Sequence, residues 1–297
     1  MINYIGELSA LITAFCWSGS SFAFTTAAQR LGSLQLNINR LILAIIFLFL
    51  TIVIAGISFS ISSSQILFLA ISGAVGFVFG DSFLFKAYQH IGARLGMLLM
   101  SLSPFMSTVL AYIFLKENLS IWGVIGIVIT IFGVALVVVE RSEIPTSKYK
   151  ISNIGIFYGL MAALGQAVGL IFAKLAFNIG EINGFLATFV RITSAVGVLF
   201  PIMILTRSYK NPLKIFAKDL KALSSTLTGT ILGPYLGVTF SLLAVEHAKV
   251  GIAATLMSTV PIIMLPIAKY VYKENLNWRS IGGAVIAVAG VAILFLR

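Results

Sequence analysis

The sequence predicts an all-α, polytopic membrane protein with ten transmembrane helices, arranged as two inverted five-helix repeats. Three observations support this prediction. Of the 297 residues, 59% are hydrophobic and 10% are charged, which leaves too few polar side chains to cover a water-soluble surface. About ten apolar runs are long enough to span a hydrocarbon core. The second half of the chain also repeats the first half.

The apolar runs are separated by short polar breaks or by breaks marked with glycine and proline. The first run has no small-residue cleavage site after it, so we expect a membrane span there and not a removable signal. The predicted spans are 5–27, 34–56, 65–86, 95–115, 121–139, 152–177, 184–206, 222–245, 250–271 and 279–296.

A shift of 157 residues aligns the stretch 76–135 with 233–292. The identical pairs include His90 with His247, Met100-Ser101 with Met257-Ser258, Pro104 with Pro261, Lys116-Glu117-Asn118-Leu119 with Lys273-Glu274-Asn275-Leu276, and Gly133-Val134-Ala135 with Gly290-Val291-Ala292. A second alignment, which covers an earlier stretch of each half, pairs Arg40 with Arg191. We therefore expect the duplication to cover the whole chain.

The repeat predicts a first unit over 1–142, a polar linker over 143–151 and a second unit over 152–297. Five spans per unit is an odd number, so the second unit enters the membrane from the opposite side. Two inverted units of similar sequence can adopt two related packings of near-equal energy. Such a pair can open a central site first to one side and then to the other, which predicts alternating access.

Several short motifs resemble the EamA branch of the drug/metabolite transporter superfamily. They are Trp17 in the first span, Arg40 early in the second, the Pro-centred fourth span that ends in Lys116-Glu117-Asn118-Leu119, and the glycine-rich fifth span. The resemblance covers both halves of the chain. It implies a ten-helix carrier with a central cavity, often an exporter of amino acids or other small metabolites, and it does not name the substrate.

Proline residues fall near the middle of the fourth and ninth spans, at Pro104 and Pro261. A proline there removes one backbone N–H and frees a carbonyl one turn earlier. The paired segments therefore predict a substrate-binding site with exposed backbone at mid-membrane. The alternative is that each proline only kinks its helix for packing. The residues of this candidate site are Met100, Ser101, Pro104, Met257, Ser258 and Pro261.

Trp17 and Gln166 are expected near the midplane, in the first and sixth spans. A tryptophan offers a flat apolar wall with one N–H donor, and a buried glutamine both donates and accepts, so the pair suits a ligand of mixed polarity. Tyr235, beside Gly233 and Pro234, is a further candidate for substrate binding. Each of these side chains has the alternative role of a packing residue or an interhelical hydrogen bond.

Arg40 and Asp81 are expected at similar depth on two antiparallel spans, the second and the third. Charges at that depth are costly unless they are paired, so the sequence predicts an ion pair. Its role is either a structural clamp or a site for a proton or a substrate ammonium group. The second copy keeps an arginine, Arg191, but has Val238 where the aspartate would repeat. This difference between the copies favours the structural clamp. Arg191 is a candidate for substrate binding because it lies, like Arg40, deep enough in its span to meet a substrate.

Charge and cysteine content argue against several other classes of protein. The net charge of +11 is carried at helix ends and not on one soluble face, so no nucleic-acid partner is expected. Cys16 is the single cysteine, which excludes an internal disulfide and a multi-cysteine metal site. No metal, cofactor or enzymatic activity is predicted, because the sequence lacks a Walker loop, a Gly-x-Ser-Gly nucleophile segment and a second intramembrane aspartate.

The sequence thus predicts a permease in the cell membrane, the inner or plasma membrane, and favours export of a small metabolite such as an amino acid. A sugar-phosphate or nucleotide-sugar exchanger is the alternative within the superfamily, and an intramembrane enzyme is a disfavoured alternative of another class. Coupling to a proton or a counter-substrate, and a monomeric or homodimeric state, remain open. The charge of the loops predicts both termini outside the cell, whereas the resemblance implies both inside.

Overall fold

The computed structural model describes residues 4–100, 102–141, 152–260, 262–263 and 278–296, and each regular element within these residues is helical. The first half contains α1 (Ile5–Leu31), α2 (Ser33–Ile54), α3 (Ser63–Gly73), η1 (Ala74–Gly80), α4 (Asp81–Met100), α5 (Ser103–Leu110), η2 (Ala111–Leu115) and α6 (Ile121–Arg141). The second half contains α7 (Asn153–Ile179), α8 (Gly184–Leu205), α9 (Pro212–Phe216), α10 (Leu220–Thr230), η3 (Ile231–Gly237), α11 (Val238–His247), α12 (Val250–Met257) and α14 (Trp278–Leu296). The η elements are π-helices.

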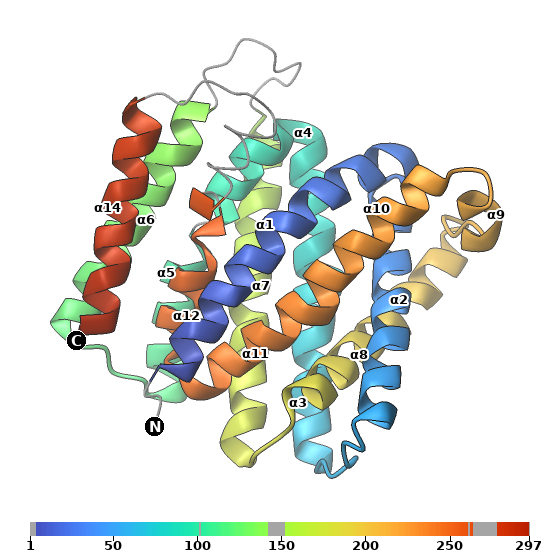
Figure 1. The fold of residues 1–297 in the computed structure, drawn as a ribbon, viewed down its shortest axis with the longest axis horizontal. Helices are drawn as coiled ribbons and strands as arrows, with labels where there is room; N and C mark the ends of the chain where they lie inside the picture. Colours follow the sequence, from blue (N-terminus) through green and yellow to red (C-terminus); the bar gives the residue numbers. More distant parts are fainter. Residues whose placement is uncertain (1–3, 101, 142–151, 261, 264–277, 297) are drawn as a thin grey trace.

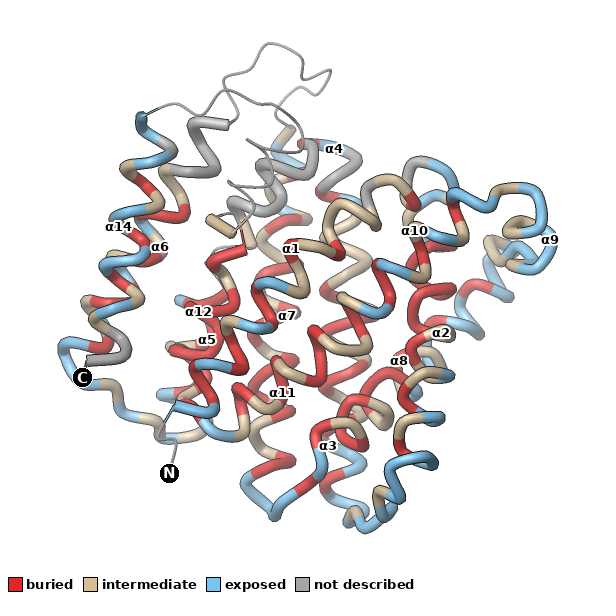
Figure 2. The backbone as a smooth tube through the Cα atoms, viewed as in Figure 1, coloured by how far each residue is buried: buried red, intermediate tan, exposed pale blue. Residues whose placement is uncertain are grey.

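Within the described residues, six helical segments are long and apolar enough to cross a membrane, which confirms the predicted all-α membrane fold. They are Ile5–Ala28, Ser33–Ile54, Ser63–Ala87, Asn153–Ile179, Gly184–Leu205 and Leu220–His247. Three shorter apolar helices cover Ser103–Leu115, Ile121–Leu136 and Ile281–Ile293. The predicted ninth span, 250–271, lies partly outside the described residues. Large apolar side chains are exposed along the outside of the bundle, while buried residues line the facing sides of the helices (Figure 2).

The boundary predicted between the third and fourth spans is wrong. The apolar runs predict a break between residues 86 and 95, but α4 is continuous from Asp81 to Met100. The stretch has no proline, and its one glycine before residue 95, Gly92, costs a helix only about 1 kcal/mol. Nothing local therefore stops the helix. The break comes instead before Pro104, which lies in the first turn of α5 and not in the middle of a helix.

Two π-helices occupy matching places in the two halves of the chain. The segments η1 and η3 each have seven residues, and their first residues, Ala74 and Ile231, are 157 positions apart. Segment η1 packs against α7, and segment η3 packs against α1. Each π-helix therefore crosses the first helix of the other half.

Most of the buried apolar residues form two clusters. One lies between α2, α3 and α8, and the other lies around α11 and α12 with parts of α1, α6 and α7. Helices α6 and α14 form a separate pair at the edge of the bundle (Figure 1). Their backbones approach closely at Gly133 and Gly290, because a Cβ atom on either glycine would overlap backbone atoms of the facing helix.

Figure 1 shows the start of α1 and the end of α14 at the same end of the bundle. The loop with α9, which carries Arg207, Lys210, Lys214 and Lys218, lies at the opposite end. The basic loop with α9 thus lies on the opposite side of the protein from the start of α1 and the end of α14.

Candidate functional site

The expected ion pair between Arg40 and Asp81 is present between α2 and α4. Arg40 donates from Nη2 to Asp81 Oδ2 and from Nε to Asn37 Oδ1 at 2.9 Å. Its guanidinium also lies over the rings of Phe24 and Phe85, 5.1 and 5.3 Å from their centroids. The arginine is 8% exposed. The pair therefore joins α2 to the helix that begins directly after η1.

Arg191 is buried in the contact between α8, η1 and α7. Its side chain lies over the Phe77 ring, with Cζ 4.9 Å from the centroid. A methyl group on Gly76 would come within 2.9 Å of its Nη2, and one on Gly169 within 3.3 Å. The residue is 2% exposed, and its Nε has no hydrogen-bond partner within the described part of the chain.

Trp17 and Gln166 lie at comparable helix crossings, one in each half. The Trp17 indole contacts Gly237, the last residue of η3, where a Cβ would come within 2.6 Å of Cδ1 and Nε1. The backbone of Gln166 lies beside Gly80, the last residue of η1, where a Cβ would lie 3.5 Å from the Gln166 amide nitrogen. Trp17 and Gln166 are both half-buried. The two candidates therefore contact the matching ends of the two π-helices.

The two Met-Ser-x-x-Pro segments coincide with helix ends. Met100 is the last residue of α4, and Met257, which is buried, is the last residue of α12. Ser258 Oγ donates to the carbonyl of Thr255 at 2.8 Å, and Pro104 is buried. Helices α5 and α12 pack together, so the two segments converge in one region of the bundle. Ser101 and Pro261 lie outside the described residues.

Tyr235 lies in η3 and contacts the other half of the chain. Its hydroxyl shares a hydrogen bond of 2.7 Å with Thr51 Oγ1 of α2. Its ring lies 5.9 Å from Phe47 and 6.0 Å from Phe185, measured between centroids. The side chain is partly buried between α2 and α8 and is separate from the contacts of Trp17, so it serves interhelical packing in this conformation.

Lys174 was not predicted as a functional residue, although a lysine near the end of the sixth span was the available signal. Its Nζ donates to the carbonyls of Val245 at 2.7 Å, Glu246 at 2.9 Å and Ala248 at 3.3 Å. These carbonyls belong to the end of α11, where the backbone has no further helical donors. On the other side of the break, Glu117 Oε2 accepts from the Val250 amide, 2.9 Å away, at the start of α12. Charged side chains thus stabilise the break between α11 and α12.

We expect Lys174→Met to lower the stability of the folded protein by on the order of 2 kcal/mol, because it removes a charged donor from three carbonyls and keeps most of the apolar stem. Thermal unfolding of the detergent-purified protein measures this effect. Lys214→Met in the exposed loop is the matched control and should leave the midpoint unchanged. Equal midpoints for the two variants would contradict the capping role.

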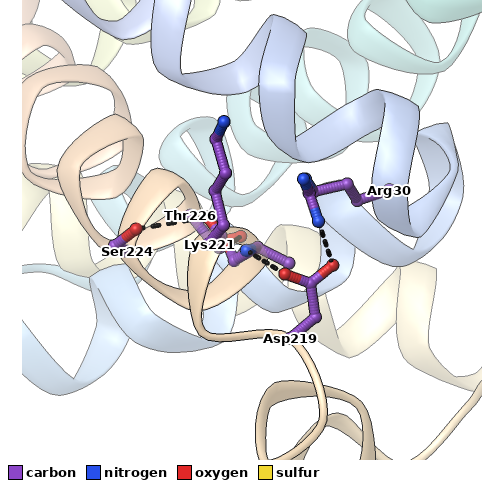
Figure 3. Close-up of polar contacts among 6 residues, drawn as sticks. Arg30, Asp219, Lys221, Ser224 and Thr226 are labelled. Carbon is purple, nitrogen blue, oxygen red and sulfur yellow. Dashed lines mark hydrogen bonds and ion pairs between the residues drawn. The ribbon is translucent and has the colours of Figure 1, made fainter.

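Arg30 and Asp219 form an exposed ion pair between the end of α1 and the start of α10 (Figure 3). Arg30 Nη1 lies 2.6 Å from Asp219 Oδ2, and Asp219 Oδ1 accepts from the Ala222 amide at 2.9 Å as the N-cap of α10. The hydrogen bond from the Ala222 amide, followed by that from Arg30, lowers the pKa of Asp219. The carboxylate thus caps one helix and links it to the other half.

The stability that Asp219 contributes should depend on pH. Its folded-state pKa is lowered, so the contribution is complete above the unfolded pKa of about 3.9 and is lost as the pH falls through the folded pKa. At neutral pH we expect the unfolding midpoint to fall slightly in Asp219→Asn, which keeps a capping oxygen, and further in Asp219→Ala. Thermal scans at pH 7 and below pH 4 test this. A difference between wild type and Asp219→Asn that persists unchanged in acid would refute it.

Comparison with known proteins gives a consistent assignment. The model of the EamA-like transporter family matches residues 4–139 and 153–296. An uncharacterized transporter from Archaeoglobus fulgidus is 20% identical over 292 residues, which cover 97% of each chain. A crystal structure of a protein with 14% sequence identity matches with a TM-score of 0.78 and covers 98% of this chain and 96% of that chain. At this identity the structural likeness shows the fold alone. The family match over nearly the whole length, on a bundle of membrane-spanning helices, shows that this multi-pass membrane protein belongs to the EamA-like transporter family.

Proposed function

We propose that the protein is a secondary active permease of the cell membrane that exports a small metabolite, such as an amino acid, by alternating access. The observation that carries the proposal is the matching pair of π-helices, η1 and η3. Each crosses the first helix of the other half, at Gln166 and at Trp17. Irregular helices at the interface of two repeats are the usual place for a transported substrate.

Contacts at the two ends of the bundle also support the proposal. At one end, Arg30 binds Asp219 through opposite charges. At the other end, Gln65 Nε2 donates to the carbonyl of Gly180 at 3.0 Å. Both contacts join a helix of one half to a helix of the other half. A carrier has to break such contacts on one side at a time, which these few polar bonds allow.

Counterflow in sealed proteoliposomes tests the proposal. Vesicles are loaded with a mixture of unlabelled amino acids, and uptake of each radiolabelled amino acid is followed from a dilute outer solution. A carrier shows saturable uptake and transient accumulation against the label's gradient. A pore shows neither, and either linear uptake or equilibration without accumulation would overturn the proposal. Protein-free vesicles give the background.

A further inference from the structure

Arg191 carries a charge deep in the bundle, and no carboxylate of the described residues is in contact with it. It follows the start of α8 at Gly184 by about two turns, or roughly 10 Å along the helix axis. The side chain is almost fully buried, with an exposed fraction of 2%. Within the described residues, Arg191 forms no ion pair, and its Nε has no hydrogen-bond partner. An isolated charge in a bilayer is costly, so this position is expected to have a function.

The surroundings of Arg191 leave room for its guanidinium but do not neutralise it. Gly76 and Gly169 lie beside Nη2, where a methyl group would come within 2.9 and 3.3 Å. The Phe77 ring covers one face of the planar group. A cation–π contact of this kind offsets part of the cost of burial. It supplies no acceptor in the plane of the guanidinium, where the N–H groups point.

The charges of this region do not balance. Phe77 precedes Asp81 by about one helical turn, so Arg191 and the Arg40–Asp81 pair lie near each other along η1 and α4. Asp81 is already bound to Arg40. The matching position of the second half, Val238, is apolar and buried. Two guanidinium groups therefore share one carboxylate, and one positive charge is left over.

We infer that Arg191 binds the carboxylate of a small substrate, which supplies the missing negative charge. The inference rests on the proposed transport function and names its substrate class. A carboxylate can accept two parallel hydrogen bonds from a guanidinium, and its single charge matches the single unbalanced arginine. A doubly charged phosphate would leave an excess negative charge. The charge balance thus favours a substrate with a single carboxylate group, such as an amino acid or a monocarboxylate, over a sugar phosphate.

Access to Arg191 requires the helices to separate. In this conformation α3 and α8 are in close contact at Gly73, where a Cβ would overlap the carbonyl of Arg191. The ring and the glycine that enclose the guanidinium, Phe77 and Gly76, belong to the π-helix η1. A change from π to α geometry in η1 would rotate these residues relative to α8. The guanidinium would then be uncovered, as alternating access demands.

Substrate analogues on the wild-type protein provide a test that depends on no variant. The counterflow assay is repeated with each transported amino acid in competition with its carboxamide and with the amine that lacks the carboxylate. We expect both analogues to compete at least about tenfold more weakly than the parent, because a neutral group forfeits the charge-assisted pair. Equal competition by the carboxamide would overturn the inference and leave the transport function intact. An absence of counterflow for all amino acids in the mixture, with folded protein in tight vesicles, would overturn the proposed function itself.

Two variants test whether the substrate carboxylate binds to Arg191. Arg191→Lys keeps the charge but not the planar fork, and we expect its KM for the carboxylate substrate to rise at least about tenfold. Arg191→Gln should lose saturable uptake. Lys214→Gln, an exposed basic residue of the α9 loop, is the matched control with an unchanged KM. Size-exclusion profiles and thermal midpoints identify variants that are folded. A folded Arg191→Gln protein with the wild-type KM would refute the assignment. If that variant does not fold, the competition by substrate analogues on the wild-type protein decides the question.

Discussion

Transport is expected to stop, and the folded state to lose about 3–5 kcal/mol, when Asp81 is replaced by asparagine. The substitution leaves the Arg40 guanidinium without its carboxylate, and only 10% of that side chain is exposed to solvent. Arg191, which interacts electrostatically with Asp81, would lose the same negative charge. Flux in proteoliposomes and thermal unfolding in detergent measure the two effects.

The double variant Arg40→Met with Asp81→Asn distinguishes two roles of the ion pair, a structural clamp and a proton-coupling site. Removing both charges should restore most of the stability, because a buried ion pair is often replaceable by apolar groups. If Asp81 serves only as a clamp, transport returns with stability. If it carries a coupled proton, the double variant is stable but its flux no longer depends on pH. A well-folded Asp81→Asn protein with unchanged flux and pH dependence would exclude both roles in transport.

A comparably large effect is expected for Gly290→Leu in α14. A Cβ atom at this position would meet Thr130 and, at 2.9 Å, the carbonyl of Gly126, both in α6. Backbone atoms of a helix cannot move aside one by one, so the two helices must separate. Overpacking of this kind costs about 1–3 kcal/mol or more. Because α14 packs chiefly on α6, we expect it to detach, which limited proteolysis of the C-terminal helix would detect.

Gly282→Leu is the matched control in the same helix. A Cβ at Gly282 would have no atom within 4 Å, and leucine is a better helix former than glycine. This variant should therefore keep or raise the thermal midpoint. If both leucine variants behaved alike, the close contact between α6 and α14 would not determine the stability of this pair.

Apolar run length predicted most of the helices, because a bilayer imposes a minimum length that the sequence shows directly. The boundaries of α2 and α8 agree with the expected spans to within a few residues. The π-helices η1 and η3 could not be predicted. Both pack against the first helix of the other half. Pro234 inside η3 indicates an irregular helix there, but Ala74–Gly80 has no proline, and π-helices are too rare to be expected from a short apolar stretch.

The candidate site was predictable where charge limits the choices. Arg40 and Asp81 had to pair because neither is stable alone at that depth, and Arg191 was a candidate because it also lies deep in its span. The environment of Arg191 was not predictable, since it depends on Gly76 and Gly169 from two other helices. The same holds for Lys174, whose three carbonyl partners lie at the end of α11, far away in the sequence.

The unbalanced guanidinium of Arg191 has a further consequence, which concerns the membrane voltage. A charge that crosses the full bilayer changes its energy by about 2.3 kcal/mol per 100 mV. With a bound monocarboxylate the region around Arg191 is neutral, so the voltage changes its energy little, whereas a zwitterionic amino acid also brings an ammonium group and keeps one positive charge in the region. Without ligand, the extra positive charge feels the field whenever the surrounding helices rearrange. For a monocarboxylate, the membrane potential would then set the rate at which the empty protein resets, and not the rate at which the loaded protein delivers its cargo.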